Sequence, residues 1–158
     1  ANIVYSNTDI VERALRESDL VIGAVLIPGA SAPRLIKKGD LSTMIPGSVF
    51  VDIAIDQGGC AETSRATTHD KPTYMIDNVV HYCVANMPGA VPLTSALALN
   101  HSVLPYALAL ADKGWKKALE ENPHFLNGLN VAGGDITHEA VAQALDLEAI
   151  SAGDKIAA

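Results

Sequence analysis

The sequence is poor in cysteine and in basic residues, and it has no long uninterrupted apolar run. Only two of its 158 residues are cysteines, Cys60 and Cys83. Their wide separation supports neither a disulfide framework nor a zinc site, so we expect two free thiols. Lys and Arg number 11 against 18 Asp and Glu, a net charge of −7, which argues against a nucleic-acid partner. No apolar run reaches the ~20 residues that a membrane helix needs, so no membrane partner is expected.

The remaining composition is that of a globular protein. An apolar fraction of 49% in 158 residues suffices for one domain with a real core, or for parts of two. The first residues, ANIVYSN, do not have the basic and apolar regions of a signal peptide, and we expect a cytoplasmic protein. The chain opens in a strand-like segment without an initiator methionine, so we expect it to be part of a longer polypeptide.

Apolar periodicity predicts alternating helices and strands in the first half of the chain. The first helix has Asn7 or Thr8 as its N-cap, and the next segment is continuously apolar, as in a strand buried on both faces. Such alternation is typical of a parallel sheet covered on both sides, so we predict an α/β fold, half of a doubly wound domain. The predicted order is a helix at 7–19, a strand at 20–27, a helix at 32–44, a strand at 48–55, and one or two short strands within 73–86.

The alternation of helices and strands ends after Pro88. From Thr94 to about Leu119, small and apolar residues recur at helical spacing, with Pro105 expected to break or kink the run. A second helix is predicted at 137–146, and residues 151–158 have the composition of a frayed tail. The C-terminal third is therefore predicted to be helical and to lie outside the alternating pattern.

Three predicted strand ends carry residues suited to ligand binding, which in open parallel sheets takes place beyond the carboxyl ends of the strands. Val25–Gly29 is apolar and suits a flat heterocycle or a ribose, Asp56 is followed by Gly58 and Gly59, and Asn86 precedes two prolines. A carboxylate at the mouth of an apolar strand is partly removed from water, which favours acid–base chemistry, and glycines allow a ligand to approach the backbone. Each feature alone is equally typical of an ordinary turn.

The glycine fingerprint G-x-G-x-x-G of dinucleotide-binding folds does not occur. The nearest segment, Gly58–Cys60, does not join a strand to a helix with the required spacing. This absence fits a piece of a dinucleotide-binding domain as well as it fits a different ligand.

Two motifs carry a family resemblance. The segments VDIAIDQGGC and HYCVANMPGAVPLTSALALNHSVLPYALALADKGW resemble the alanine dehydrogenases of the alanine dehydrogenase and pyridine nucleotide transhydrogenase superfamily, and the similarity runs from about Ile3 to about Leu147. The family has two Rossmann-like domains. The resemblance implies that residues 1–86 are the C-terminal half of the NAD-binding Rossmann domain, a doubly wound parallel sheet. Residues 87–158 would be a helical segment returning toward an N-terminal substrate domain.

The resemblance also implies roles for individual residues. The acid of the DQGG motif, Asp56 here, lies beside the nicotinamide and acts in catalysis, while the asparagine of the NMP motif, Asn86, contacts cofactor and substrate. Ser6 is expected near the adenosine half of NAD, and Leu35 on the adenine side. Further cofactor contacts are implied for Val25, Leu26, Ile53, Ala54, Ile55, Arg65, Val84, Ala85 and Met87, in addition to Asp56 and Asn86.

Other parts of the family's active site have no counterpart in these residues. The substrate-holding arginine and lysine and the catalytic histidine belong to the N-terminal domain of the family. His81, His101 and His138 are expected to be surface or capping residues instead, and no metal site is predicted.

The leading function is the reversible, NAD-dependent oxidative deamination of L-alanine to pyruvate and ammonia, with Asp56 moving protons; the isolated chain is expected to be inactive. One alternative is the dinucleotide-binding module of a nicotinamide nucleotide transhydrogenase, a relative that generally lacks both motifs. Another is a non-catalytic oligomerisation fragment, because the apolar stretch Leu97–Leu110 suits an interface. The resemblance implies a homo-oligomer, a hexamer, acting in amino-acid catabolism.

Overall fold

The structure is a computed structural model that describes residues 1–28 and 30–157. Gly29, which the sequence analysis placed at a ligand-binding strand end, lies outside the described residues. The chain divides into two compact units, Ala1–Ala90 and Val91–Ala158, and each is considered by itself.

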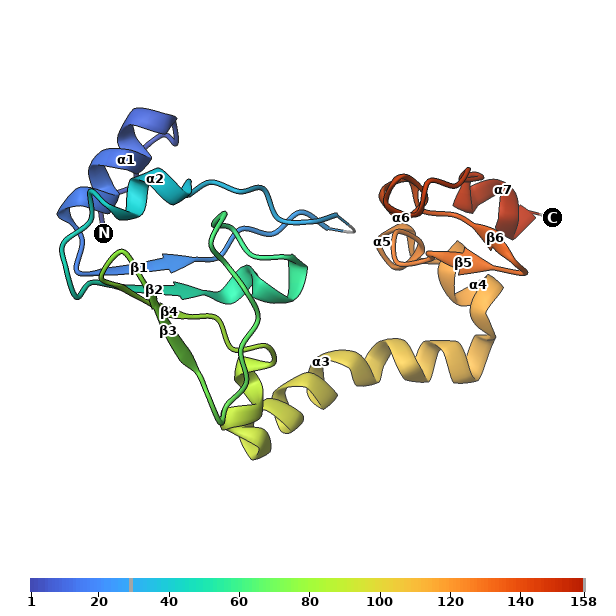
Figure 1. The fold of residues 1–158 in the computed structure, drawn as a ribbon. Coiled ribbons are helices and arrows are strands. Elements are labelled where there is room, and N and C mark those ends of the chain that lie inside the picture. The colour runs from blue at the N-terminus through green and yellow to red at the C-terminus, as the bar shows by residue number, and fades with distance from the viewer. Residues whose placement is uncertain (29, 158) are drawn as a thin grey trace. The chain divides into compact units, whose positions relative to one another are not determined.

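The first unit contains a four-stranded sheet with the order β1-β2-β4-β3 (Figure 1). β1 (Leu20–Gly23), β2 (Val49–Asp52) and β4 (Val79–Tyr82) are parallel to one another. β3 (Thr73–Ile76) is antiparallel to β4. The predicted α/β class and mostly parallel sheet are therefore confirmed, with a β-hairpin as the edge.

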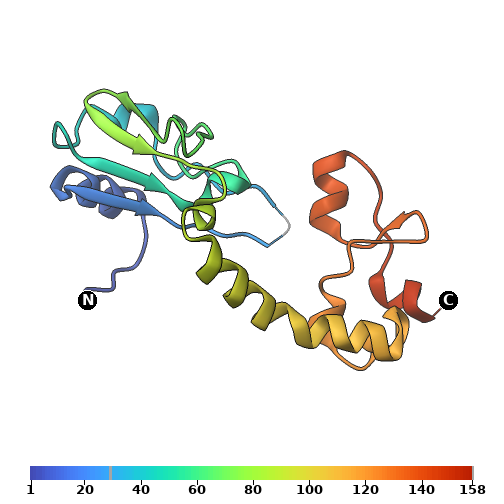
Figure 2. The same ribbon diagram turned by 90° about the horizontal axis from the view of Figure 1, so that it is seen from below.

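Two helices lie over one face of this sheet; in Figure 2 they lie behind the strands. α1 (Thr8–Glu17) is confirmed, and its N-cap is Asn7, whose side chain accepts a 2.9 Å hydrogen bond from the Ile10 N–H. The helix predicted at 32–44 is reduced to α2 (Lys38–Leu41). The earlier residues are extended because the N–H groups of Leu35 and Ile36 both donate to the Cys60 carbonyl, which a helix would not allow.

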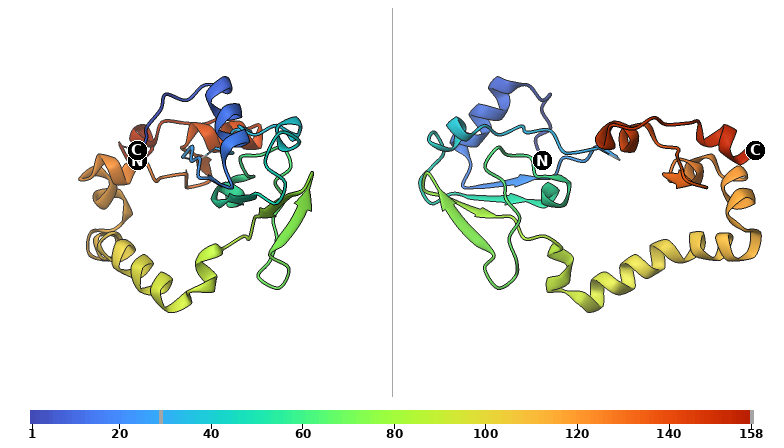
Figure 3. Two further views of the ribbon diagram at one scale, coloured as in Figure 1. Left: turned by 90° about the vertical axis from the view of Figure 1, so that its left-hand side faces the viewer. Right: turned by 45° about the vertical axis from the view of Figure 1, so that its right-hand side comes forward.

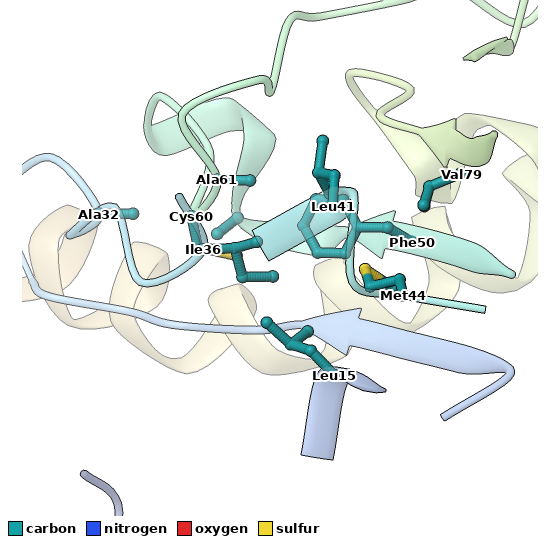
Figure 4. Close-up of a cluster of buried hydrophobic side chains, with 10 residues drawn as sticks. Leu15, Ala32, Ile36, Leu41, Met44, Phe50, Cys60, Ala61 and Val79 are labelled. Atoms are coloured by element: carbon teal, nitrogen blue, oxygen red, sulfur yellow. The ribbon is translucent and has the colours of Figure 1, made fainter. Parts of the chain in front are cut away.

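The core lies between these helices and the sheet, centred on the fully buried Phe50 of β2 (Figure 4). Alternation along the strands places every second side chain on this covered face. The prediction that the strand at 20–27 is buried on both faces is wrong: Leu20 and Ile22 are 56% and 57% exposed. Both point to the opposite face of the sheet, which no described element of the first unit covers.

His81 of β4 is also part of the buried layer, so the expectation of a surface or capping histidine is wrong for this residue. Its ring is fully buried, 5.5 Å from the Phe50 ring and 4.9 Å from the Tyr74 ring. Nδ1 hydrogen-bonds the Val79 carbonyl, and Nε2 the Thr63 hydroxyl. Burial lowers the pKa of His81, because desolvation disfavours the charged ring.

The second unit begins with α3 (Pro92–Lys113), which contains no buried residue. Of the predicted break or kink at Pro105, the break is wrong, because α3 continues past this residue as one helix (Figure 3). The helix is capped by Gly114, at a φ of 74°. By length and composition alone α3 could cross a membrane, contrary to the sequence expectation. A single such helix is weak support for a membrane span, and His101 lies exposed within it.

The rest of this unit is less helical than predicted. The helix expected at 137–146 is present as α6 (Glu139–Leu145), with His138 in the N-cap position. A short hairpin over residues 131–136 was not predicted, and its turn consists of Gly133 and Gly134, both at positive φ. The prediction of a frayed tail is wrong for the described residues, because Lys155 Nζ lies 2.6 Å from a carboxylate oxygen of Asp135 in the hairpin. Ala158 lies outside the described residues. The remaining elements are α4 (Trp115–Glu120), α5 (Pro123–Leu126), β5 (Val131–Ala132), β6 (Asp135–Ile136) and α7 (Ala152–Ala157).

Phe50 should be the most sensitive core position of the first unit. Phe50→Ala removes a fully buried ring and should lower the free energy of unfolding by about 3–5 kcal/mol, measured by urea denaturation of the full-length protein. Phe50→Leu, which keeps most of the apolar volume, should cost about half as much. A loss below about 1 kcal/mol for Phe50→Ala would contradict this description of the core.

Candidate functional site

The three parallel strands of the first unit deliver the predicted site residues to one edge of the sheet. β1 leads into Ala24–Leu26, β2 into the 3₁₀ turn η1 (Ile53–Gln57), and β4 into Val84–Met87. Because the carboxyl ends of parallel strands share an edge, these segments gather where open α/β sheets bind their ligands.

A cavity at this edge is lined by the segments that follow β1 and β2. Its walls are mainly apolar, and Asp56 contributes the one carboxylate among the lining residues. Ile55, which was predicted as a contact, is instead buried and does not line this cavity. The lining residues are Ala24, Val25, Leu26, Ile53, Ala54, Asp56 and Gln57.

A second, more polar cavity brings together two residues predicted for the adenosine half of a cofactor. Ser6 and Leu35 both line it, at the N-terminal end of α1. Arg34, Lys37 and Asp40 add charges to its wall. Glu12 lines it as well, so its wall carries charges of both signs. This cavity can supply hydrogen bonds to a polar ligand, whereas the first suits a flat apolar ring.

The sequence predicted that the strand continues to Ile55, and this prediction is wrong. β2 ends at Asp52 and the chain turns into η1. This places Asp56 on an exposed turn, so the expected partial removal of its carboxylate from water does not occur within the described residues. In this position the carboxylate is open to water and borders the apolar cavity.

The segment after β4 is held by its own backbone. Asn86 has a φ of 55°, in the left-handed region, and its carbonyl accepts a 2.9 Å bond from the Gly89 N–H and lies 3.1 Å from His69 Nε2. Val84 is buried and pairs with Thr67. Ala85, Asn86 and the half-buried Met87 are thereby presented at the sheet edge; Met87 opens the 3₁₀ helix η2 (Met87–Ala90).

Arg65 is positioned by the hairpin strand β3. Its guanidinium lies 4.0 Å from the centre of the Tyr74 ring, and its backbone N–H donates to the Tyr74 hydroxyl at 3.0 Å. That hydroxyl in turn donates to the Thr63 carbonyl. Burial raises the pKa of Tyr74, so the phenol stays neutral, and Arg65 is presented as an oriented exposed cation.

Sequence reasoning missed Asp52, the most buried acid near this edge. Its side chain is 0% exposed. One carboxylate oxygen accepts hydrogen bonds from the Cys60 N–H at 2.9 Å and the Ser64 hydroxyl at 2.5 Å. The signal was available: alternation places residue 52 on the same face as the core residue Phe50, where an acid requires donors.

The two cysteines are free, as predicted, and both are buried. Burial, together with the Asp52 carboxylate 3.5 Å from the sulfur, raises the pKa of the Cys60 thiol to about 12. Burial likewise raises the pKa of Cys83. Both thiols therefore stay protonated and poorly nucleophilic at neutral pH.

Gly58 and Gly59 have different structural reasons for being glycine, and the expectation that glycine leaves room for a ligand is wrong for Gly59. A Cβ on Gly59 would lie 2.5 Å from Ser64 Cβ and 2.7 Å from an Asp52 oxygen, so the protein's own side chains fill that space and no ligand does. A Cβ on Gly58 would meet nothing within 4 Å. This residue is glycine because its φ of 93° caps η1 in the left-handed region.

Backbone hydrogen bonds join the walls of the two cavities. The Ala32 N–H donates to the Gln57 carbonyl at 2.9 Å, and the Leu35 N–H donates to the Cys60 carbonyl at 2.8 Å. The Glu62 N–H donates back to the Ile36 carbonyl. The segment that carries Leu35 is thus fixed to the loop that follows Asp56. Among the described residues, no cluster of three or more His, Cys, Asp or Glu side chains could hold a metal.

A twisted, mainly parallel sheet with cavities at the carboxyl ends of its strands is the architecture of α/β nucleotide-binding domains. Residues 1–139 match the family described as alanine dehydrogenase/PNT, C-terminal domain. The chain belongs to this family.

Named relatives agree with this assignment. The alanine dehydrogenase of Halomonas elongata is 61% identical over 153 residues, 97% of this chain, and that of Mycolicibacterium smegmatis is 54% identical over 90% of this chain. A solved L-alanine dehydrogenase superposes with a TM-score of 0.73 at 51% identity, over 90% of this chain and 39% of the other. A transhydrogenase from Sinorhizobium meliloti gives 0.61 at 26% identity, over 85% of this chain and 36% of the other. The chain spans only 41% and 38% of the two named relatives.

The two adjacent glycines provide a matched test of the loop geometry. Gly58→Ala meets open space and should cost about 1 kcal/mol, the strain of a left-handed alanine. Gly59→Ala adds a collision with Asp52 and Ser64 to a similar strain and should cost at least about 2 kcal/mol more. Denaturation of both variants measures the difference, and equal losses would show that the loop does not pack as described.

Proposed function

We propose that the protein carrying this chain is an NAD-dependent L-alanine dehydrogenase. It converts L-alanine, NAD and water to pyruvate, ammonium, the reduced cofactor and a proton. The observation that carries this proposal is the 61% identity to a named alanine dehydrogenase over nearly the whole chain, together with a carboxylate at the mouth of an apolar cavity at the sheet edge.

The residues at the sheet edge fit such a cofactor. The apolar cavity beside Val25, Leu26 and Ile53 suits the nicotinamide ring, and the polar cavity at Ser6 and Leu35 suits the adenosine end. Arg65, Ala54 and the segment Val84–Met87 would complete the contacts. Ile55 supports the turn from within the core. Held by these residues, NAD would supply the acceptor for the hydride that leaves the substrate carbon.

The chain's own contribution to the chemistry is proton transfer and orientation. Asp56 lies exposed on η1, where its carboxylate can take a proton from the substrate amine or from the water that attacks the imine. Asn86, held by the backbone turn at Gly89, offers an amide that orients substrate and cofactor. The groups that bind the substrate carboxylate would come from a part of the full-length protein that corresponds to the unmatched part of the relatives.

The domain arrangement follows from the same proposal. Residues 1–86 would be the C-terminal half of the NAD-binding domain, and residues 87–158 the helical segment that returns to a substrate domain.

The transhydrogenase alternative is weaker, because the match to a solved transhydrogenase has half the sequence identity of the match to a solved L-alanine dehydrogenase. The proposed enzyme is cytoplasmic and acts in amino-acid catabolism.

The protein would act as a homo-oligomer, a hexamer by resemblance to its family. The support on this chain is α3, which has no buried residue although Leu97, Leu99 and Leu108 are among its side chains. Apolar surface of this extent is covered in folded proteins, and a subunit interface is one way to cover it. A non-catalytic oligomerisation fragment would also expose an apolar helix. Oligomer formation alone therefore does not distinguish such a fragment from a dehydrogenase.

Asp56→Asn in the full-length protein tests the catalytic role. The substitution keeps the shape of the side chain but removes the titrating charge, so kcat for alanine oxidation should fall by about 10²–10⁴. NAD affinity, measured by calorimetry, should change by less than about tenfold.

Asp70→Asn is the matched control, because it makes the same chemical change at another exposed loop acid and should leave kcat unchanged. Asn86→Ala should raise KM more than it lowers kcat. An Asp56→Asn enzyme that oxidises alanine at the unaltered rate would overturn the assignment.

A further inference from the structure

One buried charge near the sheet edge has no part in the proposed reaction. Asp52 ends β2, is fully buried, and is not among the residues that line the apolar cavity beside Asp56. We propose that Asp52 is a positioning residue: through the Cys60 N–H and the Ser64 hydroxyl it fixes the turn that holds Asp56 in its working orientation. The inference rests on the proposed dehydrogenase function.

The first support is energetic. A carboxylate removed from water costs several kcal/mol unless donors replace the lost hydration. Here Asp52 receives the Cys60 N–H at 2.9 Å and the Ser64 hydroxyl at 2.5 Å, with the Cys60 thiol 3.5 Å from its other oxygen. Charge-assisted bonds of this kind are stronger than neutral ones. Every one of these donors lies beyond Asp56 in the chain, so the carboxylate ties the start of the turn to its end.

The second support is the closed geometry of the turn. The Gly58 N–H donates to the Ile55 carbonyl and the Gly59 N–H to the Ala54 carbonyl, each at 3.0 Å. The bond from Cys60 to Asp52 spans eight residues and encloses both of these. Asp56 therefore lies inside nested hydrogen-bonded rings, and its backbone has little freedom while the outermost bond is intact.

The third support is that two glycines lie where a side chain would collide with Cys60 or Asp52, the partners of the outermost hydrogen bond. A Cβ on Gly23 of β1 would lie 2.2 Å from the Cys60 sulfur. A Cβ on Gly59 would lie 2.7 Å from the Asp52 carboxylate. Both glycines allow the loop to close onto the end of β2, so the packing is arranged around the buried bond rather than around an opening for ligand.

Ser64→Ala weakens this anchor without leaving Asp52 wholly unpaired, because the Cys60 N–H remains. In the full-length protein we expect kcat for alanine oxidation to fall by about 10- to 100-fold, since a small misplacement of a catalytic group can cost about 10² in rate. KM for alanine and the Kd for NAD should stay within about threefold. Ser48→Ala is the matched control, because Ser48 is a buried serine at the other end of β2 whose hydroxyl has no hydrogen-bond partner among the described residues.

A double-mutant cycle separates positioning from mere stabilisation. If Ser64 and Asp52 act through Asp56, then Ser64→Ala should reduce kcat by less than about threefold once Asp56 is already asparagine. If they only stabilise the fold, Ser64→Ala should change kcat by the same factor in both backgrounds. Rates are compared well below the melting temperature of each variant.

The outcomes distinguish the two levels of the account. An unaltered protein that does not oxidise alanine refutes the proposed function itself. An active protein in which Ser64→Ala behaves like Ser48→Ala, or in which the two substitutions at Ser64 and Asp56 multiply independently, refutes the positioning role and leaves the function standing. A selective loss of kcat that disappears in the Asp56→Asn background supports the inference.

Discussion

The hydrogen bonds to the buried Asp52 carboxylate constrain the functional edge of the first unit more than any other interaction. An ionised acid on the core face of a strand needs donors, and the chain supplies them by returning after η1 so that Cys60 and Ser64 reach the carboxylate. That return explains why Gly59 carries no side chain. It also brings the Cys60 carbonyl to the N–H of Leu35, so one buried charge organises the walls of both cavities.

Each unit leaves apolar surface uncovered. One face of the sheet exposes Leu20, Ile22 and Met75, and α3 exposes apolar side chains along its whole length. Surfaces of this kind are covered in folded proteins by other parts of a polypeptide or by another subunit. The turn η1 is different in character, because its hydrogen bonds are made by residues of this chain alone.

Sequence alone predicted the elements whose signals are local. The capping signal at Asn7 or Thr8 located α1, and the apolar run 48–55 located β2, although that strand ends three residues earlier, at Asp52. It failed where tertiary hydrogen bonds override local preference: Leu35 pairs with the Cys60 carbonyl instead of forming a helix. The motifs singled out Asp56, and the structure places this residue in the wall of the strand-end cavity. Asp52 was missed because its importance depends on donors eight and twelve residues away, whose convergence only the folded chain reveals.

The most direct test of this account is the hydrogen–deuterium exchange of the Cys60 amide in the full-length protein. Cys60 lies outside the helices and strands, yet its N–H is buried and donates to a carboxylate. We predict that this amide exchanges as slowly as that of Val51 in β2, and that Ser64→Ala accelerates its exchange. Exchange of the Cys60 amide as fast as that of the exposed loop residue Ala66 would contradict the claim that Asp52 anchors the turn η1.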